Sequence, residues 1–320
     1  MEERHRRGIS RIVGRDVRFD RPMRLYTTLR IGGNAAAFAG VKSLDVLKGA
    51  VFYAETHGLF WTVLGKGSNL LVSDEGIDGL VIRLQGELAG VSMEEAGTCL
   101  RAGGGATIRR ILDACARDGL GGLEFLAGIP GTAGGAVAMN AGARDREVGD
   151  SVKLVQLLAP DGKTSSADTG ALSFSYRRCA LPEGALVTGV LFRVERESPD
   201  VVRSRIRENL EVRRSTQPLS YPSAGSVFRN PPGDAAGRLV EQAGLKGKRI
   251  GGAEISTLHA NFIVNRGGAS AKDVLSLMKT AREEVFRVTG IELESEVRMI
   301  GFRAGQWPGH GFGPRGGPLC

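Results

Sequence analysis

Four glycine-rich clusters lie between residues 31 and 136 of this 320-residue chain, and they constrain its fold more than any other feature. They occupy residues 31–33, 64–71, 102–105 and 128–136. Glycine adopts positive φ angles and lets backbone N–H groups approach an anion closely. Any single cluster is more simply a structural turn. Four of them, two containing Ser or Thr donors, favour a large phosphate-bearing ligand.

The common nucleotide-binding motifs do not account for these clusters. In the segment around Lys66 the lysine precedes the second glycine, whereas a P-loop requires Gly-Lys-Ser/Thr in that order. The pattern G-x-G-x-x-G fails at residues 103–108 because position 108 is Ile. A P-loop or a Rossmann site is therefore not expected.

Composition and charge narrow the class of protein. With 42% apolar and 24% charged residues the chain has the composition of a globular protein of about two domains, and it has no apolar run long enough to cross a membrane. Of the net charge of +8, residues 1–24 contribute eight Arg against four acids, and residues 301–320 contribute two Arg. Because the charge gathers at the two ends, which we interpret as flexible extensions, no nucleic-acid partner is expected.

The cysteines and the N-terminal sequence indicate where in the cell the protein is expected. The chain has four scattered Cys, without C-x-x-C or His spacing, so no metal site is expected. Nor does an apolar stretch follow the basic N-terminal residues, as it would in a secretory signal. A cytoplasmic protein with reduced thiols is expected, and a monomer.

Alternating apolar periodicities predict mixed α and β structure. Ser43, Thr107 and Ser270 are expected to begin helices, and Gly58, Gly119 and Gly290 to end them, with Phe286 on the buried face of the last. A further helix is expected over 201–214. Strands are expected at residues 60–64, 80–84, 99–102, 152–158, 186–194 and 292–300.

These elements suggest a division of the chain near residue 200. We expect a basic extension over 1–24, one domain over 25–200, a second over 201–302, and a disordered Gly/Pro-rich tail over 303–320.

Ordered motifs in both halves resemble one family, the UDP-N-acetylenolpyruvoylglucosamine reductases. Its FAD-binding half is matched by L-G-x-G-S-N-L-L-V at 64–72 and G-I-P-G-T-x-G-G-A-x-x-x-N-A-G-A at 128–143. Its second half is matched by P-S-A-G-S-V-F-R-N-P at 222–231, A-G-L-K-G at 243–247, H-A-N-F-I-V-N at 259–265 and L-E-S-E-V at 293–297. The resemblance spans about residues 25–301.

The resemblance implies an α+β fold, with a two-part FAD-binding domain of the vanillyl-alcohol-oxidase (PCMH) type followed by a smaller α/β substrate domain. It implies a flavoenzyme of peptidoglycan precursor synthesis. NADPH would reduce non-covalently bound FAD, which would then pass a hydride to the enolpyruvyl group of UDP-N-acetylglucosamine enolpyruvate, giving UDP-N-acetylmuramate.

The resemblance also assigns roles to residues. Arg177 would stabilise the developing enolate, Ser226 would protonate carbon, and Glu296 would polarise or position the enolate-bearing group. From the residues alone, a solvated Arg and a turn Ser are the simpler explanations of Arg177 and Ser226, and Glu296 lies on an ordinary solvated strand face unless a ligand covers it. Implied FAD contacts are Gly65, Gly67, Ser68, Asn69, Leu70, Gly103, Gly128, Ile129, Pro130, Gly131, Thr132, Gly134, Gly135 and Ala136. For the substrate, Asn230 matches a family contact, and Tyr176, Arg213 (or Arg214) and Gln217 are weaker candidates.

One branch of the family has an inserted loop that carries a substrate-closing tyrosine. Only 35 residues separate Arg177 from Arg213, and none is Tyr, so the chain resembles the shorter branch.

Two other functions compete with the reductase hypothesis. A sugar or alcohol oxidase of the same superfamily would commonly tether FAD through a His in the second glycine loop, and residues 102–106 contain none. A non-catalytic nucleotide- or nucleic-acid-binding protein would depend on the Arg-rich N-terminus instead.

Overall fold

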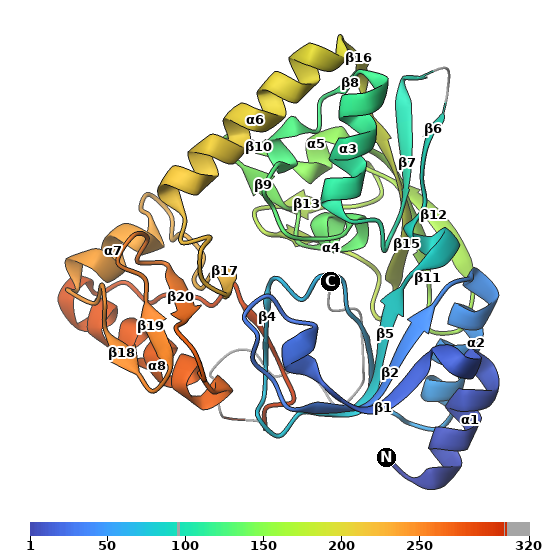
Figure 1. Cartoon of the computed structure of the whole chain (residues 1–320), viewed down its shortest axis with the longest axis horizontal. Helices are drawn as coiled ribbons and strands as arrows, with labels where there is room; N and C mark the ends of the chain where they lie inside the picture. The colour runs from blue at the N-terminus through green and yellow to red at the C-terminus, as the bar shows by residue number, and fades with distance from the viewer. Residues whose placement is uncertain (95–96, 304, 306–320) are drawn as a thin grey trace.

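The computed structural model describes residues 1–94, 97–303 and 305. Most of the tail expected to be disordered, residues 304 and 306–320, lies outside the described residues. The elements form three groups around a central region, described below as the first, second and third group (Figure 1). The long helix α6 (Pro199–Thr216) runs from the second group, at the top of the view, towards the third group.

The first group is a four-stranded sheet covered by two helices. Its strand order is β1-β2-β5-β3, in which β2, β5 and β3 are parallel and β1 is an antiparallel edge. The strands are β1 (Val17–Pro22), β2 (Asn34–Val41), β3 (Trp61–Val63) and β5 (Ile77–Leu84), and the helices are α1 (Glu3–Val13) and α2 (Leu44–Thr56). Ser43 caps α2, as its position before the apolar stripe predicts.

The second group is an antiparallel sheet with strand order β12-β11-β15-β7-β6. Its strands are β6 (Val91–Glu94), β7 (Cys99–Gly103), β11 (Val152–Leu158), β12 (Thr164–Asp168) and β15 (Leu186–Arg193). Helices α3 (Ile108–Asp118) and α4 (Ala133–Ala138) share its apolar core. Thr107 caps α3 and Gly119 ends it in the left-handed conformation, as predicted.

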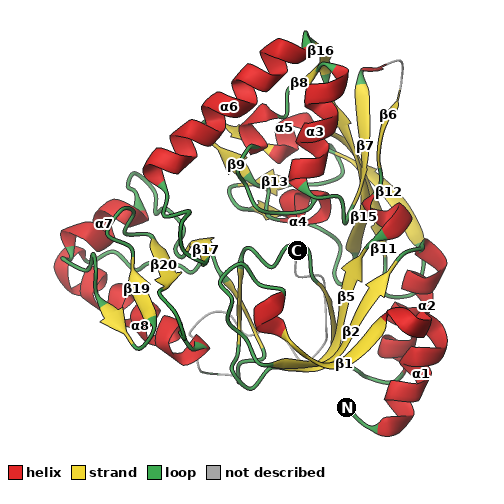
Figure 2. Cartoon of the chain, in the orientation of Figure 1, coloured by secondary structure: helices red, strands yellow, loops and turns green. Residues whose placement is uncertain are grey.

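Short elements complete the second group (Figure 2). They are β8 (Leu120–Gly121), β9 (Gly142–Ala143), β10 (Arg146–Glu147), α5 (Val148–Ser151), β13 (Phe174–Ser175), β14 (Arg178–Cys179) and β16 (Glu195–Arg196).

The third group is a sheet of order β17-β20-β19-β18 with two helices. It comprises β17 (Ser223–Ser226), α7 (Ala236–Gln242), β18 (Arg249–Ile250), β19 (Ala253–Ile255), β20 (Phe262–Asn265) and α8 (Ala271–Thr289). The chain then returns to the first half, where β21 (Arg298–Ile300) pairs in parallel with β4 (Leu70–Val72).

Helix α8 has the predicted ends but not every predicted buried residue. Ser270 and Asp273 form a capping box, and Gly290 ends the helix with φ 72°. Phe286 is 57% exposed, so its expected burial is wrong. It follows Val285, which ends the buried stripe, and one residue further rotates it off that face.

Helix α6 belongs with the second group. Val202 lies in the same core as Ile111 and Leu112 of α3, and Ile206 and Leu210 pack against that core. The expected division near residue 200 falls at the start of α6, and the structural division lies after this helix.

The expectation that residues 1–24 are a flexible extension is wrong. Ile9 and Val13 of α1 are buried in the first core with Leu47 and Val51 of α2, and β1 forms an edge of the sheet. The basic side chains occupy the solvent face, where Arg6 pairs with Asp20. The Arg-rich segment is therefore part of the first group.

Replacing Ile9 tests this correction. We expect Ile9→Ala to lower the free energy of unfolding by about 2–5 kcal/mol, because Ile9 is 1% exposed in a closed core. Arg11→Ala, on the exposed face of the same helix, is the control and should change it by less than about 0.5 kcal/mol. Denaturant unfolding measures both. If both substitutions left the free energy of unfolding nearly unchanged, α1 would not be packed in the core of the first group.

Candidate active site

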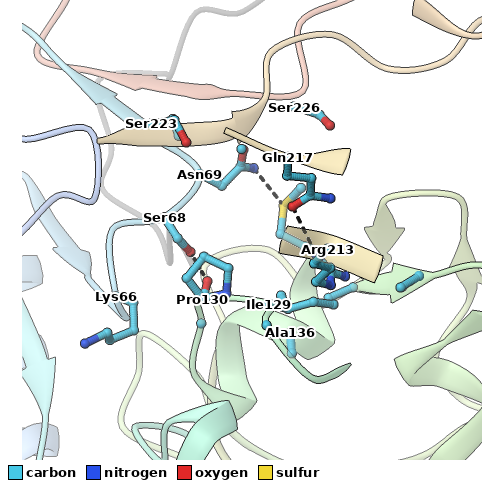
Figure 3. Close-up of a pocket in the computed structure, with 18 of the residues that line it drawn as sticks. Lys66, Ser68, Asn69, Ile129, Pro130, Ala136, Arg213, Gln217, Ser223 and Ser226 are labelled. Carbon is cyan, nitrogen blue, oxygen red and sulfur yellow. Dashed lines mark hydrogen bonds between the residues drawn. The ribbon is translucent and has the colours of Figure 1, made fainter. Parts of the chain in front are cut away.

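A cavity of about 520 Å³ lies where the three groups meet. This volume is typical of small-molecule sites. Its walls come from the loops around Ser68 and Pro130, from one face of α6, and from β17, and Figure 3 shows Ser226 on the opposite side from Ala136. It brings together most of the predicted site residues: Ser68, Asn69, Gly128, Ile129, Pro130, Gly131, Thr132, Gly135, Ala136, Arg177, Arg213, Gln217, Ser226 and Glu296.

Two of the glycine-rich loops meet at one wall of this cavity. Ser68 Oγ donates a hydrogen bond to the carbonyl of Pro130. A Cβ on Gly65 would lie 2.7 Å from Thr132 Oγ1, so only glycine allows this approach. The result is a wall of backbone and hydroxyl groups, which fits a phosphate-bearing cofactor such as FAD.

The other predicted cofactor residues are not among the described residues that line this cavity: Gly65, Gly67, Leu70, Gly103 and Gly134. Leu70 is fully buried in β4 opposite Arg298. In β7, a Cβ on Gly103 would lie 2.4 Å from the backbone of Leu88. Similarly, Gly134 packs on the carbonyl of Gly104, and Gly67 packs on Tyr26 with φ 62°. These positions support the loops rather than face the cavity.

The two-residue turn between β13 and β14 carries Arg177. Ser175 pairs with Arg178, and Arg177 occupies the turn with φ 58°. Its Nε lies 2.9 Å from Glu296 Oε1, and its Nη1 donates to the carbonyl of Gly142 at 3.4 Å. The simpler interpretation, a solvated arginine, is therefore wrong.

Glu296 and Glu294 differ in their exposure to solvent, although the predicted strand places them on the same face. The expected strand over 292–300 is shorter and covers only Arg298–Ile300, because the N–H groups of Glu296 and Val297 donate to Val227 instead of to a continuous sheet neighbour. The side chain of Glu296 is 12% exposed and that of Glu294 is 72% exposed. The solvated-face explanation holds for Glu294 only.

Ser226 lies at the end of β17, facing the cavity (Figure 3). The segment that follows it is fixed by Asn261. The amide N–H of Phe228 donates to Asn261 Oδ1 at 2.9 Å, and Asn261 Nδ2 donates to the carbonyl of Phe228 at 2.8 Å. These buried bonds hold the position of the hydroxyl-bearing strand.

Two predicted substrate residues lie elsewhere. Asn230 Oδ1 accepts from the N–H of Ala236 at the start of α7, and Tyr176 is 44% exposed beside the guanidinium of Arg177. Neither is among the described residues that line the cavity.

The cavity has a cationic lining. Lys66, Arg144, Arg177 and Arg213 contribute positive charge, and among the described lining residues Glu296 is the one carboxylate. Burial lowers the pKa of Arg213, and the nearby charge of Arg177 lowers it further. Two close, partly buried guanidinium groups favour a bound anion.

Some lining residues were missed by the sequence analysis. Asn209, Val212 and Thr216 line the cavity beside Arg213. Their spacing of three, four and seven residues is that of one helix face. The helix predicted over 201–214 could therefore have identified Asn209 and Val212, whereas Thr216 lies beyond its predicted end. Gly142 lies within the glycine-rich motif at 128–143, and Arg144 comes directly after it.

Titration of Glu296 gives a testable consequence. Burial raises the pKa of Glu296 above its ordinary value of 4.5, and Arg177 and Arg229 oppose this rise. As pH rises, the unfolded chain therefore loses this proton before the folded chain does. The free energy of unfolding falls between the ordinary pKa of Glu296 in the unfolded chain and its raised pKa in the folded protein. We expect Glu296→Gln to unfold with a higher free energy than the wild type near pH 8, and the difference to shrink towards pH 5. A pH-independent difference, or the same behaviour in the exposed control Glu294→Gln, would contradict this.

Among the residues the structure describes, no helix is long and apolar enough to cross a membrane, and no cluster of three metal-ligating side chains occurs.

Family models match both halves of the chain. Residues 35–168 match the FAD binding domain family, and residues 217–300 match the C-terminal domain of UDP-N-acetylenolpyruvoylglucosamine reductase. The predicted α+β fold, an FAD-binding domain followed by a smaller substrate domain, is confirmed.

Whole-length relatives agree. UDP-N-acetylenolpyruvoylglucosamine reductase 2 of Symbiobacterium thermophilum is 44% identical over 296 residues, covering 92% of this chain and 95% of the relative. A reductase of Anaeromyxobacter sp. (strain K) is 44% identical over 291 residues, covering 91% and 87%. The crystal structure of the Thermus caldophilus reductase matches with a TM-score of 0.78 at 39% identity, covering 89% of this chain and 99% of that one.

Proposed function

The chain belongs to the UDP-N-acetylenolpyruvoylglucosamine reductase family, and from this premise we propose that Arg177, Ser226 and Glu296 carry out its chemistry. It is an FAD-dependent oxidoreductase of peptidoglycan precursor synthesis, which reduces UDP-N-acetylglucosamine enolpyruvate to UDP-N-acetylmuramate. The observation that carries the residue assignment is the convergence of these three side chains, from three separate segments, on one cavity.

FAD, when bound, supplies hydride transfer, and the protein supplies position and electrostatic field. The residues that would hold it are those of the two glycine-rich loops at the cavity wall, including Ser68, Pro130 and Thr132. We propose NADPH as the electron donor.

Arg177 stabilises the charge that develops on the substrate. Addition of hydride to an alkene conjugated with a carboxylate places negative charge on that carboxylate as an enolate, and a fixed cation in a partly buried site stabilises it. The ion pair with Glu296 and the bond to the Gly142 carbonyl hold the guanidinium before substrate arrives.

Ser226 donates the proton to carbon. A hydroxyl is a weak acid, so this step requires a strongly basic enolate and a water-poor site. Ser226 pairs with Phe262 of β20, and Asn261 fixes the backbone two residues further at Phe228, so the position of Ser226 at the cavity is held from both sides. Glu296 positions Arg177 and helps to polarise the enolate-bearing group.

Arg213 and Gln217 bind the anionic portion of the substrate. Both line the cavity, and Arg213 is held at the end of α6, where its Nη1 contacts Gln217 Oε1 at 3.5 Å. No carboxylate is paired with Arg213 among the described ion pairs, which leaves its charge for the diphosphate or the carboxylate.

A cytoplasmic location, a monomeric state and membership of the shorter branch stay predictions. The burial of the Cys99, Cys115 and Cys179 thiols inside the protein supports a reducing compartment.

Product analysis tests the reductase reaction. The purified holoprotein is incubated with NADPH and UDP-N-acetylglucosamine enolpyruvate, and the nucleotide sugar is analysed by mass spectrometry. We expect a gain of two hydrogens that requires both NADPH and bound FAD. An unchanged sugar, with NADPH consumed only by oxygen, would contradict the proposal and favour an oxidase.

A further inference from the structure

We propose that Asn140 is a positioning residue that sets the orientation of Arg177, an inference that rests on the role proposed above for Arg177. Asn140 comes directly after α4 and Met139, and it is 1% exposed. It is not among the described residues that line the cavity, so any effect on the reaction must pass through a neighbour.

The carboxamide of Asn140 uses both its donor and its acceptor. Its Nδ2 donates to the carbonyl of Ser175 at 3.0 Å and to the carboxylate of Glu147. Its Oδ1 accepts from the N–H of Gly149 at 2.9 Å. A carboxylate of the same shape could accept from Gly149 but could donate to neither partner.

The contact with Ser175 anchors the turn that carries Arg177. Ser175 pairs with Arg178 across the turn, so a shift of the Ser175 carbonyl would shift the two residues between them. Gly149 packs against the same strand, because a Cβ there would lie 2.9 Å from the ring of Phe174. Asn140 therefore ties Gly149 and Ser175 into one unit.

The segment 140–142 also contacts the guanidinium of Arg177. Gly142, two residues after Asn140, accepts the hydrogen bond from Arg177 Nη1. Residues 140–142 thus contact Arg177 at its backbone turn and at its guanidinium. Because α4 precedes them without a break, this segment also fixes Arg177 relative to the glycine-rich loop at 128–136.

Asn140→Asp tests the proposal. Asn140 has φ 40°, which Asp tolerates better than most residues. The substitution keeps the shape of the side chain, replaces the two donors by an acceptor and places a carboxyl group beside Glu147. We expect the variant to retain FAD and to be reduced by NADPH at about the wild-type rate. Reoxidation by UDP-N-acetylglucosamine enolpyruvate should slow by about 10- to 100-fold, because a displaced catalytic group loses the productive geometry.

The pH profile separates positioning from general loosening. Beside the carboxylate of Glu147 the introduced carboxyl will have a raised pKa, and once protonated it can donate to the Ser175 carbonyl. The ratio of variant to wild-type reoxidation rates should therefore rise as pH falls. A loosened structure gives a ratio that stays flat or falls.

A double-mutant cycle with Arg177→Lys completes the test. If Asn140 acts through Arg177, the double variant reoxidises no more slowly than Arg177→Lys alone. Wild-type reoxidation in Asn140→Asp, or effects that multiply in the double variant, would overturn the inference. Absence of reoxidation in the wild type would instead overturn the proposed function.

A second variant keeps the test decisive if Asn140→Asp loses FAD. Asn140→Ser removes the carboxamide, with its two donors and its acceptor for Gly149, and places no charge beside Glu147. The same slowing of reoxidation is expected. Loss of FAD from both variants would also overturn the proposal, because Asn140 would then support the cofactor loop and not Arg177.

Discussion

Ser226→Ala should leave reduction of the bound flavin by NADPH intact and slow its reoxidation by the enolpyruvyl sugar by about 10²- to 10⁴-fold. This is the range lost when a positioned general acid is removed. The backbone of β17 is held by its pairing with β20, and the segment after it by Asn261, so the fold should not depend on the serine hydroxyl. Stopped-flow absorbance of the two half-reactions measures the effect.

Ser220→Ala is the matched control for this change. Ser220 precedes the same strand, is exposed and is not among the described lining residues, so both of its half-reactions should match the wild type. If Ser226→Ala reoxidises as fast as this control, another group donates the proton.

Arg177→Lys should slow reoxidation by about 10²- to 10³-fold, which is the cost of removing one preorganised stabilising contact. Lysine keeps the charge but not the planar fork, so it cannot contact Glu296, the Gly142 carbonyl and the substrate together. The loss should be in the rate of reoxidation at saturating substrate, with little change in reduction by NADPH.

The neighbouring Arg178 provides the control for this prediction. It is exposed in β14, and Arg178→Lys should retain wild-type rates. Equal losses in both variants would show that the turn, and not the Arg177 guanidinium, matters.

Many of the helix ends and strands could be predicted from the sequence by local rules. Thr107, Ser270, Gly119 and Gly290 mark helix ends because their side chains or their positive φ satisfy the terminal backbone groups locally. Strand 152–158 is found at its predicted bounds because its run of Val and Leu residues packs into the core of the sheet.

The N-terminal helix shows how a strong signal can mislead. Eight arginines in residues 1–24 suggested a flexible arm, yet Ile9, Ile12 and Val13 have the spacing of one helix face. These apolar residues determine that the helix packs into the core, and the arginines lie on its opposite, solvent-facing side.

The site depends on contacts that no local pattern contains. Glu296 and Glu294 share one alternation, but Glu296 is buried because Arg177 lies against it from a distant hairpin. For the same reason the sequence could name Asn230 and Gly103 as contacts. It could not show that Asn230 accepts from the first N–H of α7 or that Gly103 packs on the backbone of Leu88.

The central claim, that this cavity passes electrons from NADPH to an enolpyruvyl sugar, is tested most directly by anaerobic flavin absorbance in one cuvette. NADPH is added first and UDP-N-acetylglucosamine enolpyruvate second. The predicted result is bleaching by NADPH followed by recovery on addition of the sugar. Bleaching without recovery would contradict the substrate, and a protein that neither carries nor accepts FAD would contradict the cofactor site.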